Sequence, residues 1–207
     1  MRSRRIWRLA AGAAAIAAAG CSTAVGLAGQ GPALIPDPER ARAMMPVIIA
    51  YLDSSAYRQG GPGQGQYPAA DYQAGQVRWL CGAALVEVRP DGGRWLAGMD
   101  VACGDYVRRG LWVSLEDGGD MGHVVMVLSG GSHYQVVSAA SEGGISANPA
   151  WIDQHFSRRA ASEINNGGGG PLASMPDDQA LVAFGCTPGV KGSYGTQAAE
   201  MWPCRPD

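Results

Sequence analysis

The feature that most limits the fold of this chain is a pair of β-type segments on either side of a strong turn signal. Trp79–Val88 and Arg94–Tyr106 flank the run Arg-Pro-Asp-Gly-Gly, whose residue types favour a tight turn. A slip of one residue in their pairing would turn every side chain to the opposite face. With Cys81 opposite Cys103, one face is almost wholly apolar: Trp79, Cys81, Ala83, Leu85, Trp95, Ala97, Met99, Val101 and Cys103. The sequence therefore predicts an antiparallel hairpin with a disulfide across it.

Further β-type segments follow the hairpin. Leu111–Leu115 and His123–Leu128 flank the run Glu-Asp-Gly-Gly-Asp-Met-Gly, and Tyr134–Ala139 follows Ser-Gly-Gly-Ser-His. We interpret both glycine-containing runs as hairpin turns, because aspartate and glycine are common in tight turns. Successive strands with short turns form an antiparallel meander, so we expect a sheet of about five strands.

Helix signals stand on both sides of this β region. Asp37 can cap a first helix with Pro38 at its start, although Pro46 should kink or split it. Its core-facing positions recur at spacings of three and four: Met44, Val47, Ile48, Tyr51 and Leu52. Residues 60–76, rich in glycine and proline, predict a long surface loop.

A second helix should begin at Asn148-Pro149 and end at the glycine run 167–170. Its predicted apolar side consists of Trp151, Ile152, His155, Phe156 and Ile164. Asp177–Phe184 predicts a short third helix. The order of the elements predicts one α+β domain over residues 37–207, with one sheet face packed on two or three helices.

The first 20 residues have the three parts of a secretory signal peptide. Four arginines make the start basic, an apolar run extends from Leu9 to Ala19, and small residues precede Cys21. The apolar run has about a dozen residues, whereas a membrane-spanning helix needs about 20. We therefore expect a cleaved signal over residues 1–20, followed by a flexible tether over residues 21–36.

The end of this segment, Ala18-Ala19-Gly20-Cys21, resembles the lipobox of bacterial lipoproteins, with Ala18 where leucine is usual. The resemblance implies cleavage before Cys21, acylation of its thiol (palmitate among the acyl groups) and an extracytoplasmic protein anchored to the bilayer by lipid. In a cell with two membranes, Ser22 implies the outer one by analogy with lipoprotein sorting. The run Ser3-Arg4-Arg5-Ile6-Trp7-Arg8 resembles a twin-arginine export signal, and a plain basic start is the alternative.

The cysteine count fits that resemblance. Five cysteines would leave one thiol over in an exported protein, whereas lipidation of Cys21 leaves four for two disulfides. Four cysteines allow three pairings. The simplest joins Cys81 to Cys103, and Cys186 to Cys204 as a disulfide staple that closes the C-terminal tail. Without its first 20 residues the chain has twelve basic and eighteen acidic residues, a formal charge of −6 that argues against a nucleic-acid partner.

Two clusters of polar residues are candidate sites of chemistry. Glu116, Asp117 and Asp120 lie close to His123 in sequence and could bind a metal ion, but turn formation is the simpler explanation, and we expect no cofactor. His133 beside Ser132 could belong to a hydrolase, although catalytic triads assemble across a fold and seldom from neighbours.

The leading hypothesis is a non-catalytic envelope domain that binds a protein, a peptide or a small apolar ligand. An extracytoplasmic hydrolase is the alternative: convergence of His123, His133 and a carboxylate in one pocket would favour it, and scattered histidines would argue against it. The solute-binding component of a transporter is a third hypothesis, although such proteins are usually larger and two-lobed. The order of the elements, with a strand segment that ends Ala-Cys-Gly-Asp-Tyr, also resembles uncharacterised lipoproteins of GC-rich bacteria, and this resemblance implies no activity.

Overall fold

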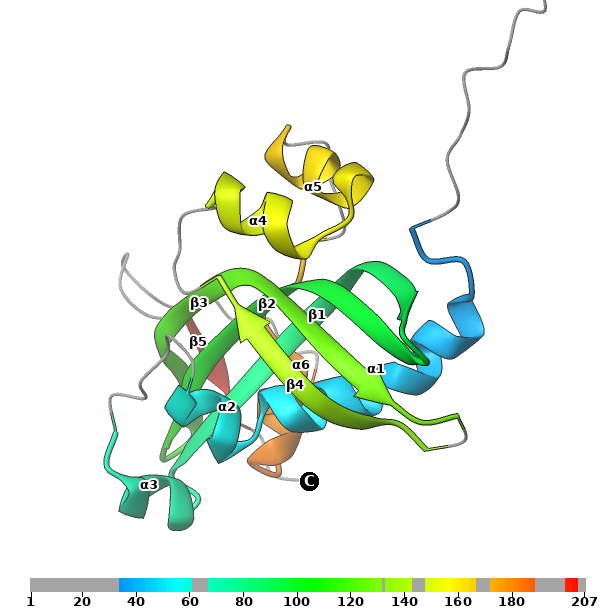
Figure 1. Ribbon diagram of the computed structural model, residues 1–207. Coiled ribbons are helices and arrows are strands. Elements are labelled where there is room, and N and C mark those ends of the chain that lie inside the picture. The colour runs from blue at the N-terminus through cyan, green and yellow to red at the C-terminus, as the bar shows by residue number, and fades with distance from the viewer. Residues whose placement is uncertain are drawn as a thin grey trace, which may run out of the picture. The chain divides into compact units, whose positions relative to one another are not determined.

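The computed structural model of the protein describes residues 34–60, 67–131, 133–142, 148–166, 172–188 and 200–204. These residues form an α+β fold with a five-stranded antiparallel sheet, as the sequence predicts. The strand order is β1-β2-β3-β4, and β5 also pairs with β3 (Figure 1). The strands are β1 (Val77–Asp91), β2 (Arg94–Arg109), β3 (Trp112–Ser129), β4 (Gln135–Ser141) and β5 (Glu200–Pro203). The predicted signal peptide lies outside the described residues.

The predicted hairpin is confirmed in register and in its disulfide. Cys81 pairs with Cys103, and the two are joined, with their Cα atoms 4.0 Å apart. A bulge after Leu85 shifts the register, so that Val88 rather than Glu87 continues the apolar face. Val86, the extra residue at this bulge, packs on the opposite face.

The hairpin turn predicted at residues 116–122 is wrong, because β3 passes through this segment as one strand. Its pairing with β2 has two register shifts, which leave Glu116 and Gly119 as extra residues. Glycine and aspartate accommodate bulges as readily as turns, so their presence did not distinguish the two structures. The turn between β2 and β3 is instead Gly110-Leu111, where Gly110 has a φ of 64° that favours glycine.

One sheet face is covered by α1 (Pro38–Leu52), with α2 (Ser55–Gly60) and α3 (Ala69–Gln73) following it. Asp37 caps α1 as predicted, and the helix continues through Pro46 without a break. Its fully buried Met44, Ile48 and Leu52 pack against the apolar face of the hairpin. The helix α3 lies within the segment that the sequence predicted to be loop.

The opposite face is covered as well, which differs from the expected single packed face. The predicted second helix is two helices, α4 (Pro149–His155) and α5 (Arg158–Asn165), because Ser157 leaves helical conformation and caps α5. Both lie on the far side of the sheet from α1 (Figure 1). Phe156 and Ile152 are buried there against Val86 and Val125.

The C-terminal part forms a third apolar cluster. The helix α6 (Asp177–Ala183) confirms the predicted third helix, and Cys186 is joined to Cys204 as predicted. The tail is less irregular than expected, because β5 pairs with β3 and buries Trp202 beside Tyr106. No helix within the described ranges is both long enough and apolar enough to span a membrane.

Candidate functional site

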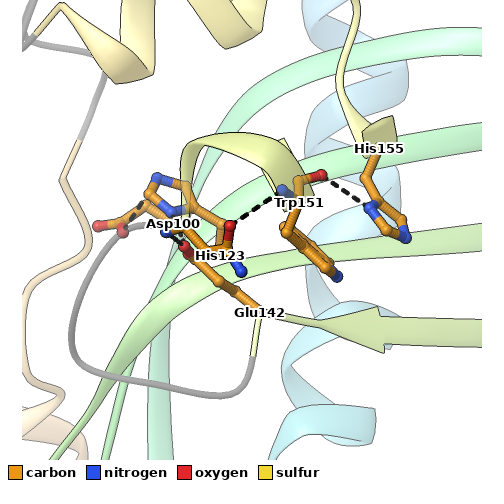
Figure 2. Close-up of polar contacts among 6 residues, drawn as sticks. Asp100, His123, Glu142, Trp151 and His155 are labelled. Atoms are coloured by element: carbon orange, nitrogen blue, oxygen red, sulfur yellow. Dashed lines mark hydrogen bonds and ion pairs between the residues drawn. The ribbon is translucent and has the colours of Figure 1, made fainter. Parts of the chain in front are cut away.

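His123 on β3 lies between two carboxylates from different parts of the chain (Figure 2). Its Nδ1 is 3.0 Å from Oε2 of Glu142, and its Nε2 is 3.9 Å from Oδ1 of Asp100. Asp100 projects from the neighbouring strand β2, where it pairs with His123, and Glu142 follows the end of β4. We call these three residues the His123 cluster.

The carboxylates of the His123 cluster also hold two backbone segments that cross this sheet face. Oδ2 of Asp100 accepts a hydrogen bond from the N–H of Ala173 at 2.7 Å. Oε1 of Glu142 accepts a hydrogen bond from the N–H of Asn148, the residue that caps α4. The cluster thus joins β2, β3, the start of α4 and the segment before α6.

Solvent reaches the His123 cluster poorly. The side chain of Glu142 is 1 % exposed and that of His123 is 15 % exposed. Phe156 approaches the imidazole edge-on, with ring centroids 5.9 Å apart. Burial raises the pKa of Asp100, and repulsion from Glu142 adds to this, while the Ala173 N–H and attraction to His123 oppose it.

The Glu142–His123 contact resembles the pair in which a carboxylate orients a general base. In a hydrolase the other imidazole nitrogen would face a nucleophilic hydroxyl or thiol. Here Nε2 faces the carboxylate of Asp100, which can hold charge but cannot donate a nucleophilic hydroxyl. Four cysteines that could supply a thiol are bonded in pairs: Cys81, Cys103, Cys186 and Cys204.

The other histidines lie elsewhere. His133 is exposed in the β3–β4 turn, whereas His123 lies at the opposite end of that strand pair. The structure therefore does not bring the two together, and Ser132 lies outside the described residues. His155 stacks on Trp151 with ring centroids 4.1 Å apart, and its Nδ1 is 2.8 Å from the Trp151 carbonyl oxygen (Figure 2).

Of the predicted metal candidates, only the side chain of Glu116 is described. Its carboxylate accepts hydrogen bonds from Ser114 at 2.7 Å and from Arg109 at 3.1 Å. The hydrogen bond from Ser114 is the main cause that lowers its pKa. The side chains of Asp117 and Asp120 lie outside the described part. Within that part, no three His, Cys, Asp or Glu side chains are grouped to hold a metal ion.

A cleft of about 350 Å³ opens between the segment before α6, α6 itself and β5. Leu181 and Trp202 line it and are almost fully buried, so they expose little apolar surface to it. The rest of the lining is mostly polar, with two carboxylates and no basic side chain. The lining residues are Ser174, Met175, Pro176, Asp177, Asp178, Gln179, Leu181 and Trp202.

Sequence reasoning named His123 but missed Asp100, Glu142 and the cleft. Asp100 gave one signal, because it is a charged residue among apolar neighbours in a predicted strand. The cleft gave no such signal, since its two sides come from segments with twenty residues of chain between them. No family model, curated protein or solved structure significantly matches this chain.

Proposed function

We propose that the protein is an exported lipoprotein, anchored to the membrane by lipid on Cys21, whose folded domain is a non-catalytic binding module of the cell envelope. The observation that carries the anchor is the pairing of the other cysteines. Two disulfides use four of the five cysteines and leave Cys21, the residue at the end of the lipobox. Disulfides also suit an oxidising compartment outside the cytoplasm.

The cleft beside α6 is the proposed binding site. Ligand sites combine apolar side chains with a few placed polar groups. Met175, Leu181 and Trp202 in the lining suit an apolar group, and the carboxylates of Asp177 and Asp178 suit a positive charge. We therefore propose that its ligand is an extended segment of an envelope protein, in which an apolar side chain stands next to a basic one.

Acyl labelling tests the anchor. Cells of the native host that express the full chain are fed an alkyne-tagged fatty acid, and the purified protein is assayed for the tag. The wild type and a Ser22→Ala control should carry the label, and Cys21→Ala should lose it. Equal labelling of Cys21→Ala and wild type, or no label on either, would overturn the anchor.

Site-specific cross-linking tests the cleft. A photoreactive amino acid at Ser174, an exposed rim residue, should give one discrete adduct with an envelope protein. Asp178→Lys should reduce that adduct at least fivefold, because it reverses the charge that attracts the partner. The same probe at Ser162, exposed on α5, is the matched control. An adduct that Asp178→Lys leaves unchanged would contradict the assignment.

A second candidate, an extracytoplasmic hydrolase, is supported by the Glu142–His123 contact alone, because His133 lies at the opposite end of the β3–β4 pair. Its test is the hydrolysis of a panel of ester and amide substrates by the purified full chain. An activity lost at least a hundredfold in His123→Gln, with unchanged circular dichroism, would establish the hydrolase. The binding module predicts no activity that depends on His123.

A further inference from the structure

The two outer strands of the sheet differ in how their edges are protected. On β1 the backbone N–H of Cys81 donates to the carboxylate of Asp53 at 2.8 Å. Further along the same strand, the N–H of Val88 donates to the carbonyl of Leu34 at 2.8 Å. The chain thus occupies the edge of β1 with its own groups, and this edge is closed to another strand at two points.

The strand β4 forms the other edge, and its protection is limited to its short length and one bulge. In the described part of the chain it pairs only with β3. Its sequence from Gln135 to Ser141 contains no charged residue and no proline. Charges and prolines are two of the devices by which sheet proteins keep an edge from pairing with another molecule. Val137, the extra residue at a bulge in this strand, is 46 % exposed, a large fraction for valine.

We propose that β4 pairs antiparallel with β4 of a second copy of this chain, with Ser138 opposite its equivalent. This register sets valine opposite alanine twice and glutamine opposite serine at the ends, so no like charges meet. Main-chain hydrogen bonds between edge strands supply the affinity. The pairing also covers the exposed side of Val137, and it joins two five-stranded sheets into one.

The symmetry of this pairing suits attachment of both copies to one membrane. Two antiparallel strands in a continuous sheet are related by a twofold axis perpendicular to the sheet. Both copies therefore present their α1 layer on the same side. Confinement to one bilayer raises the effective concentration of each copy for the other, a step that rests on the proposed lipid anchor.

Cysteine cross-linking in membranes of the native host tests the dimer. Ser138→Cys in the full chain adds a thiol at the centre of the proposed interface, and Ser162→Cys on α5 is the matched exposed control. After treatment with a short bismaleimide, Ser138→Cys should give at least five times as much dimer as Ser162→Cys. Equal dimer yields from the two variants would overturn the proposal. So would a cross-link from Ser138→Cys to a different protein instead of to a second copy of the chain.

A second variant and a separate readout keep the two proposals apart. Ser138→Lys places like charges at the twofold axis and should convert the purified full chain in detergent from dimer to monomer by light scattering. A monomeric wild type would overturn the dimer. Acyl labelling of the same preparations reports the anchor independently. If the label is missing, cross-linking is repeated with Cys21→Ala, and dimer at Ser138→Cys would then support the interface without the anchor.

Discussion

The carboxylate of Asp53, at the end of α1, accepts a hydrogen bond from the backbone N–H of Cys81 at 2.8 Å. This contact joins the first helix to the strand that carries the central disulfide. It also places a carboxyl group where burial is the main cause that raises its pKa to about 6, with the Cys81 N–H opposing the shift.

The raised pKa of Asp53 makes stability depend on pH. Because the folded pKa of about 6 exceeds the ordinary aspartate value of 3.8, the folded state binds the proton more tightly than the unfolded state. The free energy of unfolding should therefore fall as pH rises through this window, by about 1–2 kcal/mol after allowance for partial exposure. Asparagine at position 53 can still accept the hydrogen bond from the Cys81 N–H but does not titrate. In urea unfolding, Asp53→Asn should therefore lack this pH-dependent fall in the free energy of unfolding. Parallel pH profiles of variant and wild type would contradict it.

The second prediction concerns Gly98, which faces α4 and α5. A Cβ at this position would lie 2.4 Å from Cε1 of Phe156. Gly98→Ala should therefore lower the free energy of unfolding by about 1–3 kcal/mol through overpacking. Gly131→Ala is the control, because nothing lies within 4 Å of a Cβ there. Thermal unfolding of both variants checks this, and equal midpoints would show that Phe156 does not pack against the strand as described.

The third prediction concerns Glu142. Glu142→Leu removes the acceptor of the His123 imidazole and of the Asn148 N–H, so it should lower the free energy of unfolding by about 2 kcal/mol. As the control, Glu163→Leu removes an exposed partner of Arg159 and should change the free energy of unfolding by less than about 0.5 kcal/mol. Urea unfolding measures both. If the two variants lose equal stability, the His123 cluster does not brace this face.

The fourth prediction concerns the disulfides. Cys81–Cys103 and Cys186–Cys204 span 22 and 18 residues of chain, so each should stabilise the folded domain by about 3 kcal/mol in the chain-entropy model. Replacing either pair by alanine should lower the unfolding midpoint in urea, and the shift should be similar for the two pairs. Loss of folding without Cys186–Cys204 and no effect without Cys81–Cys103 would contradict this.

The sequence predicted the hairpin well because two independent constraints agree there. The cysteines and the alternating apolar face select the same register for Cys81 and Cys103. Helix starts at Asp37 and Asn148 were also predictable, since capping depends on neighbouring residues. Neighbouring residues in the sequence determine such features, so they can be predicted without knowledge of the fold.

Other features depend on contacts that local sequence does not encode. The run from Glu116 to Gly122 is a bulged strand because it pairs with β2, and turn-forming residues alone could not show this. Asp100 and Glu142 meet at His123 only after three strands have paired. The split between α4 and α5 likewise arises where Phe156 packs against the sheet.

The most direct test of the central claim is the intact mass of the protein, purified from membranes of the native host without reductant. We predict a chain that begins at Cys21, carries a diacylglyceryl group on that residue and lacks four hydrogens because both disulfides are formed. Fragmentation would place the added mass on the first residue. A chain that retains residues 1–20, or one that begins at an unmodified Cys21, would contradict the lipid anchor.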